Sequence, residues 1–567
     1  MVALKKFPLR CISTCSHRVK FGYRAFLNVP TVTLSLVHNE NVSKFNHSHS
    51  VKLLHSNSTP IFYVNAAPHI GHLYTALLAD ASCRWKELSG QEVKLVTGTD
   101  EHGIKIQRAA DLNNQSPLEF CNSVTTKYQE LFAAFEIRYT DYIRTTDDNH
   151  KTAVTHFWNK ISEHTFKGYY RGWYCANDET FLSDSQVVKA KDDSGNISVT
   201  SAESGQPCEV IEEENYLFPL HKFKDELYRW HSGSVVYPTS FMSLVDPYLD
   251  SLGDLSISRP SSRVGWGIPV PNDFSQTIYV WVDALVNYLT AFGYPDSLQD
   301  WPIDSHIVGK DILKFHAIYW PAFLLAADLP LPKSIICHSH WLVDNAKMSK
   351  SVGNVVDPMS LRDRYTADGL RYFLLREGVL GKDGNFSEGK MVDYLNSELC
   401  NTLANLLSRC TSKSINSSQL YPPFNAEVFE SAATEEWREL MDSLNSLPEK
   451  VAEHYNNFKF YKGVDCILMQ LRCTNGFFDT VKPWTLKDSE DILHLVLHLV
   501  MENLRVCSIL LQPIIPTLSA NLLDMLGVPL HSRTVEYLLP VSSGSKTRHI
   551  QASGHLFKRV ERVGGAK

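Results

Sequence analysis

The segment 60–135 constrains the fold most strongly, because strand and helix patterns alternate along it. It opens with an apolar, aromatic run that predicts a buried strand, and the spacing of the next apolar residues predicts a helix over 73–88. A second strand over 92–100 and two helices, over 104–113 and 117–135, are expected to follow. Strands separated by helices pair in parallel, so we expect an α/β fold whose ligands lie beyond the carboxyl ends of the strands.

The turn between the first strand and its helix carries His69, Gly71 and His72. A strand that enters a helix through a tight glycine turn aims backbone N–H groups at the space above the strand, and such a space favours phosphate. Two imidazoles at its rim add donors for a charge-rich transition state. Far along the chain, the polar loop 347–351 reads Lys-Met-Ser-Lys-Ser, which suits a pyrophosphate leaving group. Taken singly, each motif has a simpler explanation: the His-x-Gly-His quartet at 69–72 can arise by chance, and the loop 347–351 can be a solvated surface turn.

Between about 166 and 276 the alternation gives way to short aromatic strands and turns, which indicates an insertion into the sheet domain. Within it Cys175 stands alone, and Cys208 follows far behind. The chain has twelve cysteines but no C-x-x-C pair, whereas a tetrahedral zinc site needs four ligands, usually as two close pairs. We therefore expect reduced, mostly buried thiols and no structural zinc.

The parallel pattern resumes after the insertion and supplies candidates for a substrate pocket. One helical face carries four residues at i, i+3, i+4 and i+7: Trp281, Ala284, Leu285 and Tyr288. Ile312 and His316 share another face, and an apolar pocket with one imidazole suits a thioether side chain. Asp100 ends the second strand after a turn expected at Gly98, where its carboxylate can hold an ammonium group. Each feature also has a simpler explanation. The helical face can pack in the core, His316 can be a core histidine whose hydrogen bonds are satisfied, and Asp100 can cap a helix or a turn.

Helical periodicity dominates after residue 390 and predicts a helix bundle. Its helices are expected over 391–414, 435–457, 461–478, 492–510 and 518–526. Charged residues and a proline interrupt the apolar stretch 492–516, which therefore predicts a buried bundle helix rather than a membrane span. Asn405 and Arg409 share a helical face and Trp484 offers a stacking plane, but on the pattern alone these are ordinary surface and packing residues.

The first fifty residues contain seven lysines or arginines and one acid, with frequent serine and threonine. Such a start is typical of an organelle transit peptide, and a disordered basic arm is the alternative. Without it the net charge becomes about −13 instead of −7, so any RNA contact must use local patches. The tail, 541–567, holds six basic residues and one acid, and either contacts RNA or is solvated.

Together, the two motifs resemble the HIGH and KMSKS signatures of class I aminoacyl-tRNA synthetases. The stretch 59–72, Thr-Pro-Ile-Phe-Tyr-Val-Asn-Ala-Ala-Pro-His-Ile-Gly-His, is similar to the methionine enzyme in particular, as are 279–288 and 309–316. Over roughly five hundred residues the chain resembles a methionyl-tRNA synthetase and is most similar to the mitochondrial form.

This resemblance implies a domain plan. A transit peptide over 1–50 precedes a Rossmann-type class I catalytic domain over 51–390, which includes the connective insertion and a stem-contact segment at about 320–390. An α-helical anticodon-binding domain follows over 391–540, and then the basic tail.

The resemblance also implies roles for individual residues. The methionine pocket is expected from Ile61, Tyr63, Asp100, Trp281, Ala284, Leu285, Tyr288, Ile312 and His316, with Asp100 taking the amino group. ATP is expected at His69, Gly71, His72, Asp311, Lys347, Ser349 and Lys350, with Asp311 on the ribose. Catalysis is expected from His69, His72, Lys347 and Lys350. The expected anticodon readers are Asn405, Arg409 and Trp484.

The implied activity is ATP-dependent ligation of L-methionine to the methionine tRNA through methionyl-adenylate, for mitochondrial translation. Mg²⁺ is expected to accompany ATP, and the tRNA to serve both initiation and elongation. We expect a monomer in the mitochondrial matrix that does not associate with membranes.

Some family features are missing from the sequence. Only Cys175 stands where a zinc-binding knuckle begins, and the insertion is too short for the editing domain of the isoleucine, valine and leucine enzymes. No C-terminal dimerisation domain is expected after the bundle. Two alternatives remain: a small nucleotidyltransferase, against which the bundle and the lysine loop argue, and a catalytically inactive tRNA-binding paralogue, which would have lost active-site groups.

Overall fold

The computed structural model describes residues 54–176, 179–182, 184–191, 197–202, 204–348, 353–538, 547–551 and 554–562. Residues Lys52–Lys567 form one compact unit. The expected transit peptide, 1–50, and residues 349–352 of the lysine loop lie outside the described residues.

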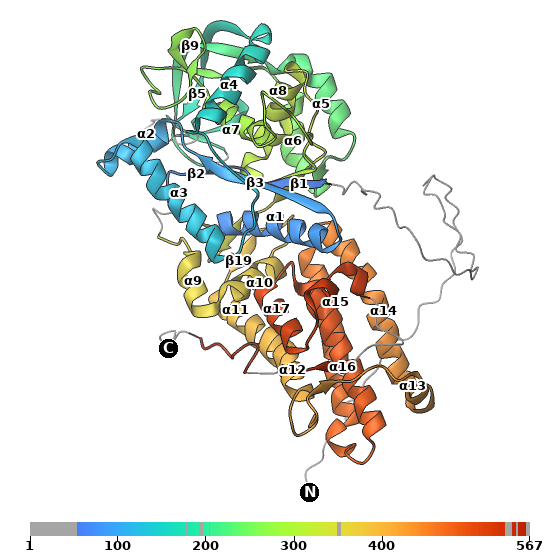
Figure 1. The fold of residues 1–567 in the computed structure, drawn as a ribbon. Helices are drawn as coiled ribbons and strands as arrows, with labels where there is room; N and C mark the ends of the chain where they lie inside the picture. The colour runs from blue at the N-terminus through green and yellow to red at the C-terminus, as the bar shows by residue number, and fades with distance from the viewer. Residues whose placement is uncertain are drawn as a thin grey trace, which may run out of the picture. The chain divides into compact units, whose positions relative to one another are not determined.

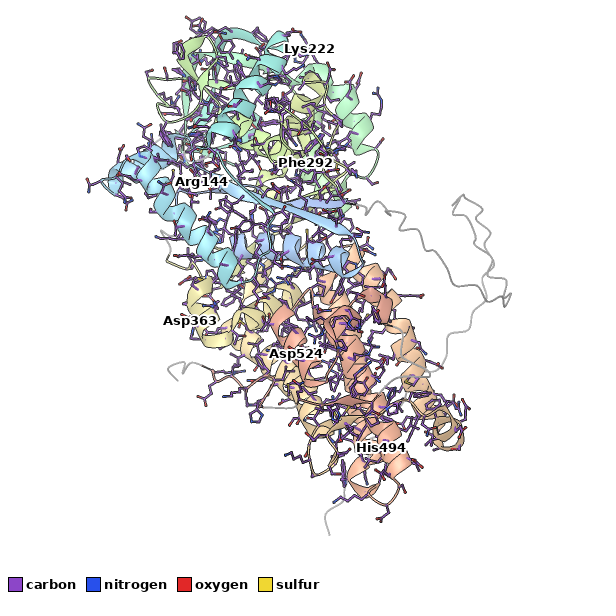
Figure 2. All side chains as sticks on the ribbon, viewed as in Figure 1. Arg144, Lys222, Phe292, Asp363, His494 and Asp524 are labelled. Carbon is purple, nitrogen blue, oxygen red and sulfur yellow. The ribbon has the colours of Figure 1, made fainter. Side chains whose placement is uncertain are left out.

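A seven-stranded sheet forms the centre of the N-terminal half (Figure 1). Its order is β10, β16, β15, β1, β3 and β2, with β4 on the other side of β3, and every pairing is parallel, as predicted. The strands are β1 Leu54–Ser58, β2 Phe62–Tyr63, β3 Glu92–Asp100, β4 Asp141–Arg144, β10 Val236–Tyr237, β15 Ser305–Gly309 and β16 Ser334–His338. A small apolar cluster joins Val96 of β3, Ile143 of β4 and Phe292, which Figure 2 labels.

The first strand and the expected turn at Gly98 differ from the prediction. Strand β1 ends at Ser58, before Pro60, and the aromatic run contributes only the two residues of β2. Proline has no N–H to donate to a strand ladder, which explains the break. Gly98 lies inside β3, where a Cβ atom would stand 1.9 Å from the carbonyl oxygen of Ile143 in β4. The glycine is therefore required by the close approach of two strands and makes no turn.

Helix α1, Ile70–Leu88, begins three residues earlier than the apolar spacing predicted, because His69 caps it. Helices α2, Ile104–Leu112, and α3, Pro117–Ala134, match their expected ranges within a residue. In Figure 1, α1 lies between the sheet and the C-terminal helices, whereas α4, Asp148–Ile161, and α7, Val280–Thr290, lie on the other side of the sheet.

The region predicted as an insertion is largely antiparallel, but it is not separate throughout. Its longest ladder pairs β5, Phe166–Cys175, with β9, Cys208–Pro219, and β6, Thr180–Leu182, extends β5. Strand β10 lies in the middle of the same region and instead joins the main sheet, because Val236 and Tyr237 pair in parallel with β16. The insertion thus returns once to the parallel sheet.

The C-terminal helices follow the predicted pattern within a few residues. They are α11 Glu388–Tyr394, a π-helical segment Leu395–Ala404, α12 Asn405–Cys410, α14 Glu435–Asn456, α15 Phe460–Val481, α16 Glu490–Leu511 and α17 Pro516–Met525. The prediction missed α13, Ala426–Ala432, which is only seven residues long and has no fully buried residue. Among the described helices, α16 alone is apolar and long enough to cross a bilayer, and 83% of its most apolar window is buried inside the fold.

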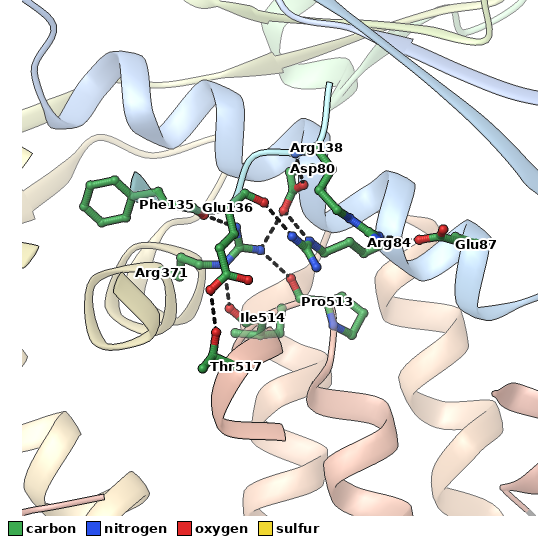
Figure 3. Close-up of polar contacts among 10 residues, drawn as sticks. All are labelled: Asp80, Arg84, Glu87, Phe135, Glu136, Arg138, Arg371, Pro513, Ile514 and Thr517. Carbon is green, nitrogen blue, oxygen red and sulfur yellow. Dashed lines mark hydrogen bonds and ion pairs between the residues drawn. The ribbon is translucent and has the colours of Figure 1, made fainter. Parts of the chain in front are cut away.

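A fully buried arginine, Arg371 of α10 (Ala367–Glu377), lies where the sheet half meets the bundle (Figure 3). Its guanidinium donates to the carboxylate of Asp80 in α1 at 2.7 Å and to the carbonyl groups of Phe135 at 2.9 Å, Pro513 at 2.9 Å and Ile514 at 3.1 Å. The main apolar core also continues from α1 through α10 into α14, α15 and α16. The bundle is therefore packed as a continuation of the sheet half.

Candidate active site

A cavity of about 340 Å³ lies at the carboxyl ends of the parallel strands. Its wall includes Asp100, Gly309 and His338, which are the last residues of β3, β15 and β16. The turn into α1 and one face of α7 complete the wall. This is the edge at which an α/β sheet places its ligands.

The cavity brings together every predicted substrate residue that the structure describes. These are Ile61, Tyr63, His69, Gly71, His72, Asp100, Trp281, Ala284, Leu285, Tyr288, Asp311, Ile312, His316 and Lys347. The predicted residues Ser349 and Lys350 lie outside the described residues.

His69 and His72 are fixed by the first turn of α1. The Nδ1 atom of His69 accepts from the backbone N–H of Gly71 at 3.0 Å, and Nδ1 of His72 accepts from the backbone N–H of His69 at 3.1 Å. The two rings stack with their centroids 3.8 Å apart. A neutral imidazole that accepts at Nδ1 carries its hydrogen on Nε2, so each ring has one fixed tautomer with Nε2 as the donor. A Cβ atom on Gly71 would stand 2.9 Å from the ring of His69, which leaves room only for glycine.

The apolar part of the cavity is built around a neutral histidine. The Nδ1 atom of His316 lies 3.0 Å from the carbonyl oxygen of Ile312, which can only accept, so Nδ1 carries the hydrogen. Burial lowers the pKa of His316 to about 4, which keeps the ring uncharged at neutral pH. Trp281 stacks on Phe315 with the ring centroids 3.6 Å apart, which holds the indole at the cavity wall.

Asp100 is buried, and its Oδ1 atom has no hydrogen-bond partner among the described residues. Burial raises its pKa well above the ordinary value, and the carboxylates of Asp283 and Glu179 raise it further. Asp283 behaves differently: burial alone would raise its pKa, but His102 at 2.7 Å and His150 at 2.9 Å lower it to about 2. The carboxylate of Asp283 thus already has two histidine partners, whereas Asp100 has an oxygen atom without a hydrogen-bond partner among the described residues. A cationic ligand in the cavity would supply that partner.

Another acidic residue of the cavity wall, Asp311, lies beside two basic groups. Its carboxylate is 3.4 Å from Nε2 of His340 and 4.0 Å from Nζ of Lys347. Enclosure alone would raise the pKa of Asp311, but His340 and Lys347 outweigh this effect and hold it below its ordinary range. Lys347 ends the short strand β18, Ala346–Lys347; its side chain lines the cavity and is 63% exposed.

Comparisons with known proteins place this architecture in a family. The family described as "tRNA synthetases class I (M)" matches residues 56–411. The chain is 49% identical over 509 residues to the human protein named methionine–tRNA ligase, mitochondrial, with 85% of this chain and 86% of the relative covered. The chain belongs to the class I methionyl-tRNA synthetases.

Other members of the family agree with this assignment. The mitochondrial methionine–tRNA ligase of Xenopus laevis is 46% identical over 490 residues, with 85% of this chain and 87% of the relative covered. The structure is similar to that of Mycobacterium tuberculosis methionyl-tRNA synthetase in complex with methionyl-adenylate, with a TM-score of 0.83, 33% identity and 89% and 99% of the two chains covered. The predicted fold class and family are confirmed.

Several residues that line the cavity were not predicted from the sequence. His338 ends β16 and His340 lies two residues further on, at the carboxyl edge of the sheet, and that position could have identified them. The Nε2 atom of His338 lies 2.8 Å from the hydroxyl of Thr75 in α1. Lys105 and Glu179 come from a helix start and from the insertion, where no periodicity marked them.

The three predicted anticodon residues lie on the surface of the bundle. Asn405 is exposed on α12, and Arg409, one turn further on, forms an ion pair with Asp479. The guanidinium of Arg409 also lies over the ring of Phe478 at 4.7 Å, and Trp484 approaches the same ring with its centroid at 6.5 Å. Trp484 is 43% exposed, so it is not a core residue of the bundle.

The two cysteines that the sequence analysis treated as far apart are neighbours in the fold. Cys175 and Cys208 are opposite each other in the β5–β9 ladder. Two thiols supply half of a tetrahedral site, and no group of three or more potential metal ligands occurs among the described residues. The residues in view therefore do not fit a zinc knuckle, and the lack of structural zinc stays a prediction.

Proposed function

We propose that this chain ligates L-methionine to the methionine tRNA at the expense of ATP, for mitochondrial translation. The observation that carries the proposal is the single cavity in which an uncharged imidazole, a buried carboxylate and two imidazoles at a helix start meet. These groups match the side chain, the ammonium group and the phosphates of the two small substrates.

Methionine occupies the apolar end of the cavity. Its thioether packs against Trp281, Tyr288 and His316, whose neutral state avoids the desolvation of a charge. Its ammonium group pairs with Asp100, whose Oδ1 atom is otherwise unsatisfied among the described residues. The remaining pocket residues, Ile61, Tyr63, Ala284, Leu285 and Ile312, line the same space.

ATP lies across the start of α1. The phosphates face the Nε2–H groups of His69 and His72 and the positive end of the helix. Gly71 permits the close approach of the phosphates. The carboxylate of Asp311 accepts hydrogen bonds from the ribose hydroxyls. The methionine carboxylate attacks the α-phosphorus in line, and the bond to the bridging oxygen of pyrophosphate breaks. Lys347, with Ser349 and Lys350 of the same loop, takes up the charge that develops on pyrophosphate.

Mg²⁺ enters this scheme as part of the substrate. No group of three or more potential metal ligands is found in the part of the chain that the structure describes, and the phosphate end of the cavity offers mainly cationic and imidazole groups. We therefore infer that Mg²⁺ is held by the phosphates of ATP, where it would neutralise part of their charge.

The second half-reaction transfers the methionyl group from the adenylate to a terminal ribose hydroxyl of the tRNA, and AMP leaves. The anticodon is read by Asn405, Arg409 and Trp484. The segment 320–390 contacts the acceptor stem of the tRNA, and the basic tail contributes local positive charge. The same tRNA serves initiation and elongation, and the enzyme acts as a monomer. A catalytically inactive paralogue would have lost groups that are present here.

The proposed site of action is the mitochondrial matrix. The human and Xenopus laevis relatives carry mitochondrial names, and the basic, acid-poor segment 1–50 is the proposed import signal. A reporter fused to residues 1–50 should enter mitochondria, and its retention in the cytosol would argue against this reading.

The decisive experiment is ATP–pyrophosphate exchange with a panel of amino acids. The protein without residues 1–50 should support exchange with methionine and not with leucine, isoleucine or valine. Exchange with leucine at the methionine rate would refute the assignment.

A further inference from the structure

Glu179 is a buried carboxylate that the insertion delivers to the cavity. It lies between β5 and β6, only 6% exposed, and it lines the same cavity as the proposed methionine residues. Its φ of +51° is a backbone conformation that side-chain-bearing L-residues adopt infrequently. A buried carboxyl group in a left-handed turn is a costly combination that points to a specific role.

Both oxygens of Glu179 bind groups from the catalytic sheet half. Oε2 accepts from the phenolic hydroxyl of Tyr63 at 2.9 Å, and Oε1 accepts from the backbone N–H of Lys105 at 2.9 Å. Lys105 lies in the first turn of α2, whose N-cap residue, Gly103, supplies no side-chain cap. The carboxylate therefore takes the place of a cap and favourably meets the positive end of the helix.

Gly103 shows how closely these groups are packed. A Cβ atom there would stand 2.7 Å from the hydroxyl of Tyr63 and 3.0 Å from Oε1 of Glu179, and the φ of Gly103 is +106°. The tip of the insertion, the start of α2 and the ring of Tyr63 thus form one contact with no spare volume.

Tyr63 connects Glu179 with the proposed methionine pocket. It is the last residue of β2 and pairs with Asp100 in the parallel register of β2 and β3. Burial, and then the Glu179 carboxylate, raise the pKa of Tyr63 well above its ordinary value, so the phenol remains a neutral donor. The hydrogen bond to Glu179 fixes the direction in which the phenol ring lies beside Asp100.

We infer that Glu179 is a positioning residue for amino-acid recognition: through its hydrogen bond it holds Tyr63 against the bound methionine. The insertion thereby sets the affinity for the amino acid, although it supplies no group to the reacting atoms. This inference rests on the proposed function, because it takes Tyr63 as a wall of the methionine pocket.

The test compares Glu179→Gln, Tyr63→Phe and the double variant in methionine-dependent ATP–pyrophosphate exchange. Each single variant should raise the KM for methionine about ten-fold, as expected for loss of a hydrogen bond to a charged group. The KM for ATP and kcat should stay within about two-fold, and the double variant should be no worse than the poorer single variant, because Tyr63→Phe removes and Glu179→Gln weakens the same bond.

Glu213→Gln is the matched control. Its carboxylate also belongs to the insertion, is 11% exposed and accepts from Arg263 at 2.9 Å and Asn215 at 2.9 Å, but it does not line the cavity. It should leave the KM for methionine within two-fold even if it lowers the melting temperature. Tyr63→Phe leaves the cap on α2 intact, so it tests the bond even if Glu179→Gln unfolds.

The possible outcomes separate the two claims. A parent protein without methionine-dependent exchange would overturn the proposed function and this inference with it. An active parent whose KM for methionine is unchanged in Glu179→Gln or Tyr63→Phe would overturn only the role of Glu179, as would additive effects in the double variant.

Discussion

The hydroxyl of Tyr288 donates a hydrogen bond of 2.7 Å to Nε2 of His316, because the other ring nitrogen already carries the hydrogen that faces Ile312. Both nitrogens of this buried imidazole are therefore engaged in hydrogen bonds, and with a pKa of about 4 the ring takes up no further proton near neutral pH. The floor of the cavity is uncharged and rigid, which suits a thioether and penalises a charged side chain.

Tyr288→Phe should weaken methionine binding with little effect on ATP. The variant leaves Nε2 of His316 as a buried acceptor without its donor, which typically costs about 1–3 kcal/mol and corresponds to a rise of roughly five-fold to a hundred-fold in the KM for methionine. Exchange kinetics at pH 7.5 measure this effect.

Because the pKa of His316 is about 4, its titration should not change the KM for methionine between pH 6 and 8. An inflection in that range that disappears in His316→Gln would contradict the assignment of a neutral ring.

Asp100 should make methionine recognition depend on pH. Its pKa is raised by burial and by neighbouring carboxylates, and only the ionised form attracts an ammonium group. A proton competes with the substrate, so the KM for methionine should rise as the pH falls through the raised pKa. Asp100→Asn should increase the KM by more than about ten-fold and remove this pH dependence, since truncation of a buried charge pair costs about 2–5 kcal/mol. Asp111→Asn, on the exposed side of α2, is the control and should change neither property.

Lys347→Ala should slow adenylate formation while leaving the KM for methionine within two-fold. Loss of one donor to a developing negative charge typically reduces a rate by about 10²–10³. Single-turnover adenylate formation measures the step directly, with Lys127→Ala on the exposed face of α3 as control. A loss of less than about three-fold would show that the loop does not act in catalysis.

Trp484→Ala should impair tRNA charging but leave methionine-dependent exchange within about two-fold. A base stacked on an aromatic plane contributes roughly 1–3 kcal/mol, so charging efficiency should fall about ten-fold to a hundred-fold. Arg409→Ala should behave in the same way, because its guanidinium and Trp484 meet on the ring of Phe478. Charging is compared on tRNAs with the natural and an altered anticodon. If Trp484→Ala discriminates between them as the parent does, this residue does not read the anticodon.

Arg371→Met should destabilise the whole unit from Lys52 to Lys567. The change leaves the carboxylate of Asp80 buried without its strongest partner, and breaking such a pair costs about 3–5 kcal/mol in the free energy of unfolding. Urea unfolding should show a loss of this size. Arg438→Met, which removes a partly exposed ion pair with Glu430, should change stability by less than about 1 kcal/mol. An equal effect of the two changes would contradict the role of the buried arginine.

Local patterns predicted the helices and the range of β3 well but misplaced the first strand and misread Gly98 as a turn, for a physical reason. The face of α7 that carries Trp281 and Tyr288 follows from a spacing of 3.6 residues per turn, which any neighbour must accommodate. Strand pairing depends on residues far away in sequence. The place of Gly98 inside β3 is set by Ile143 of β4, which a local pattern does not contain.

In the candidate site, too, local sequence patterns identified some residues, whereas contacts between distant parts of the chain determine others. Residues in the two motifs and on α7 were found from spacing and resemblance, and the cavity contains all of them that the structure describes. Glu179 was missed because its role depends on a left-handed turn in the insertion and on a hydrogen bond to Tyr63, more than a hundred positions earlier in the chain. The neighbouring positions of Cys175 and Cys208 likewise exist only in the folded ladder.

Helix α1 has a second attachment besides the turn at His69. With nineteen residues it is about 28 Å long, and beyond Asp80 its Trp85 donates to the side chain of Asn456 in α14 at 3.0 Å. One rod thus carries the phosphate-facing histidines at its first turn and is anchored in the bundle near its last. Substitutions at Asn456 should therefore impair amino-acid activation, and sorting variants by their distance from the cavity would misclassify them.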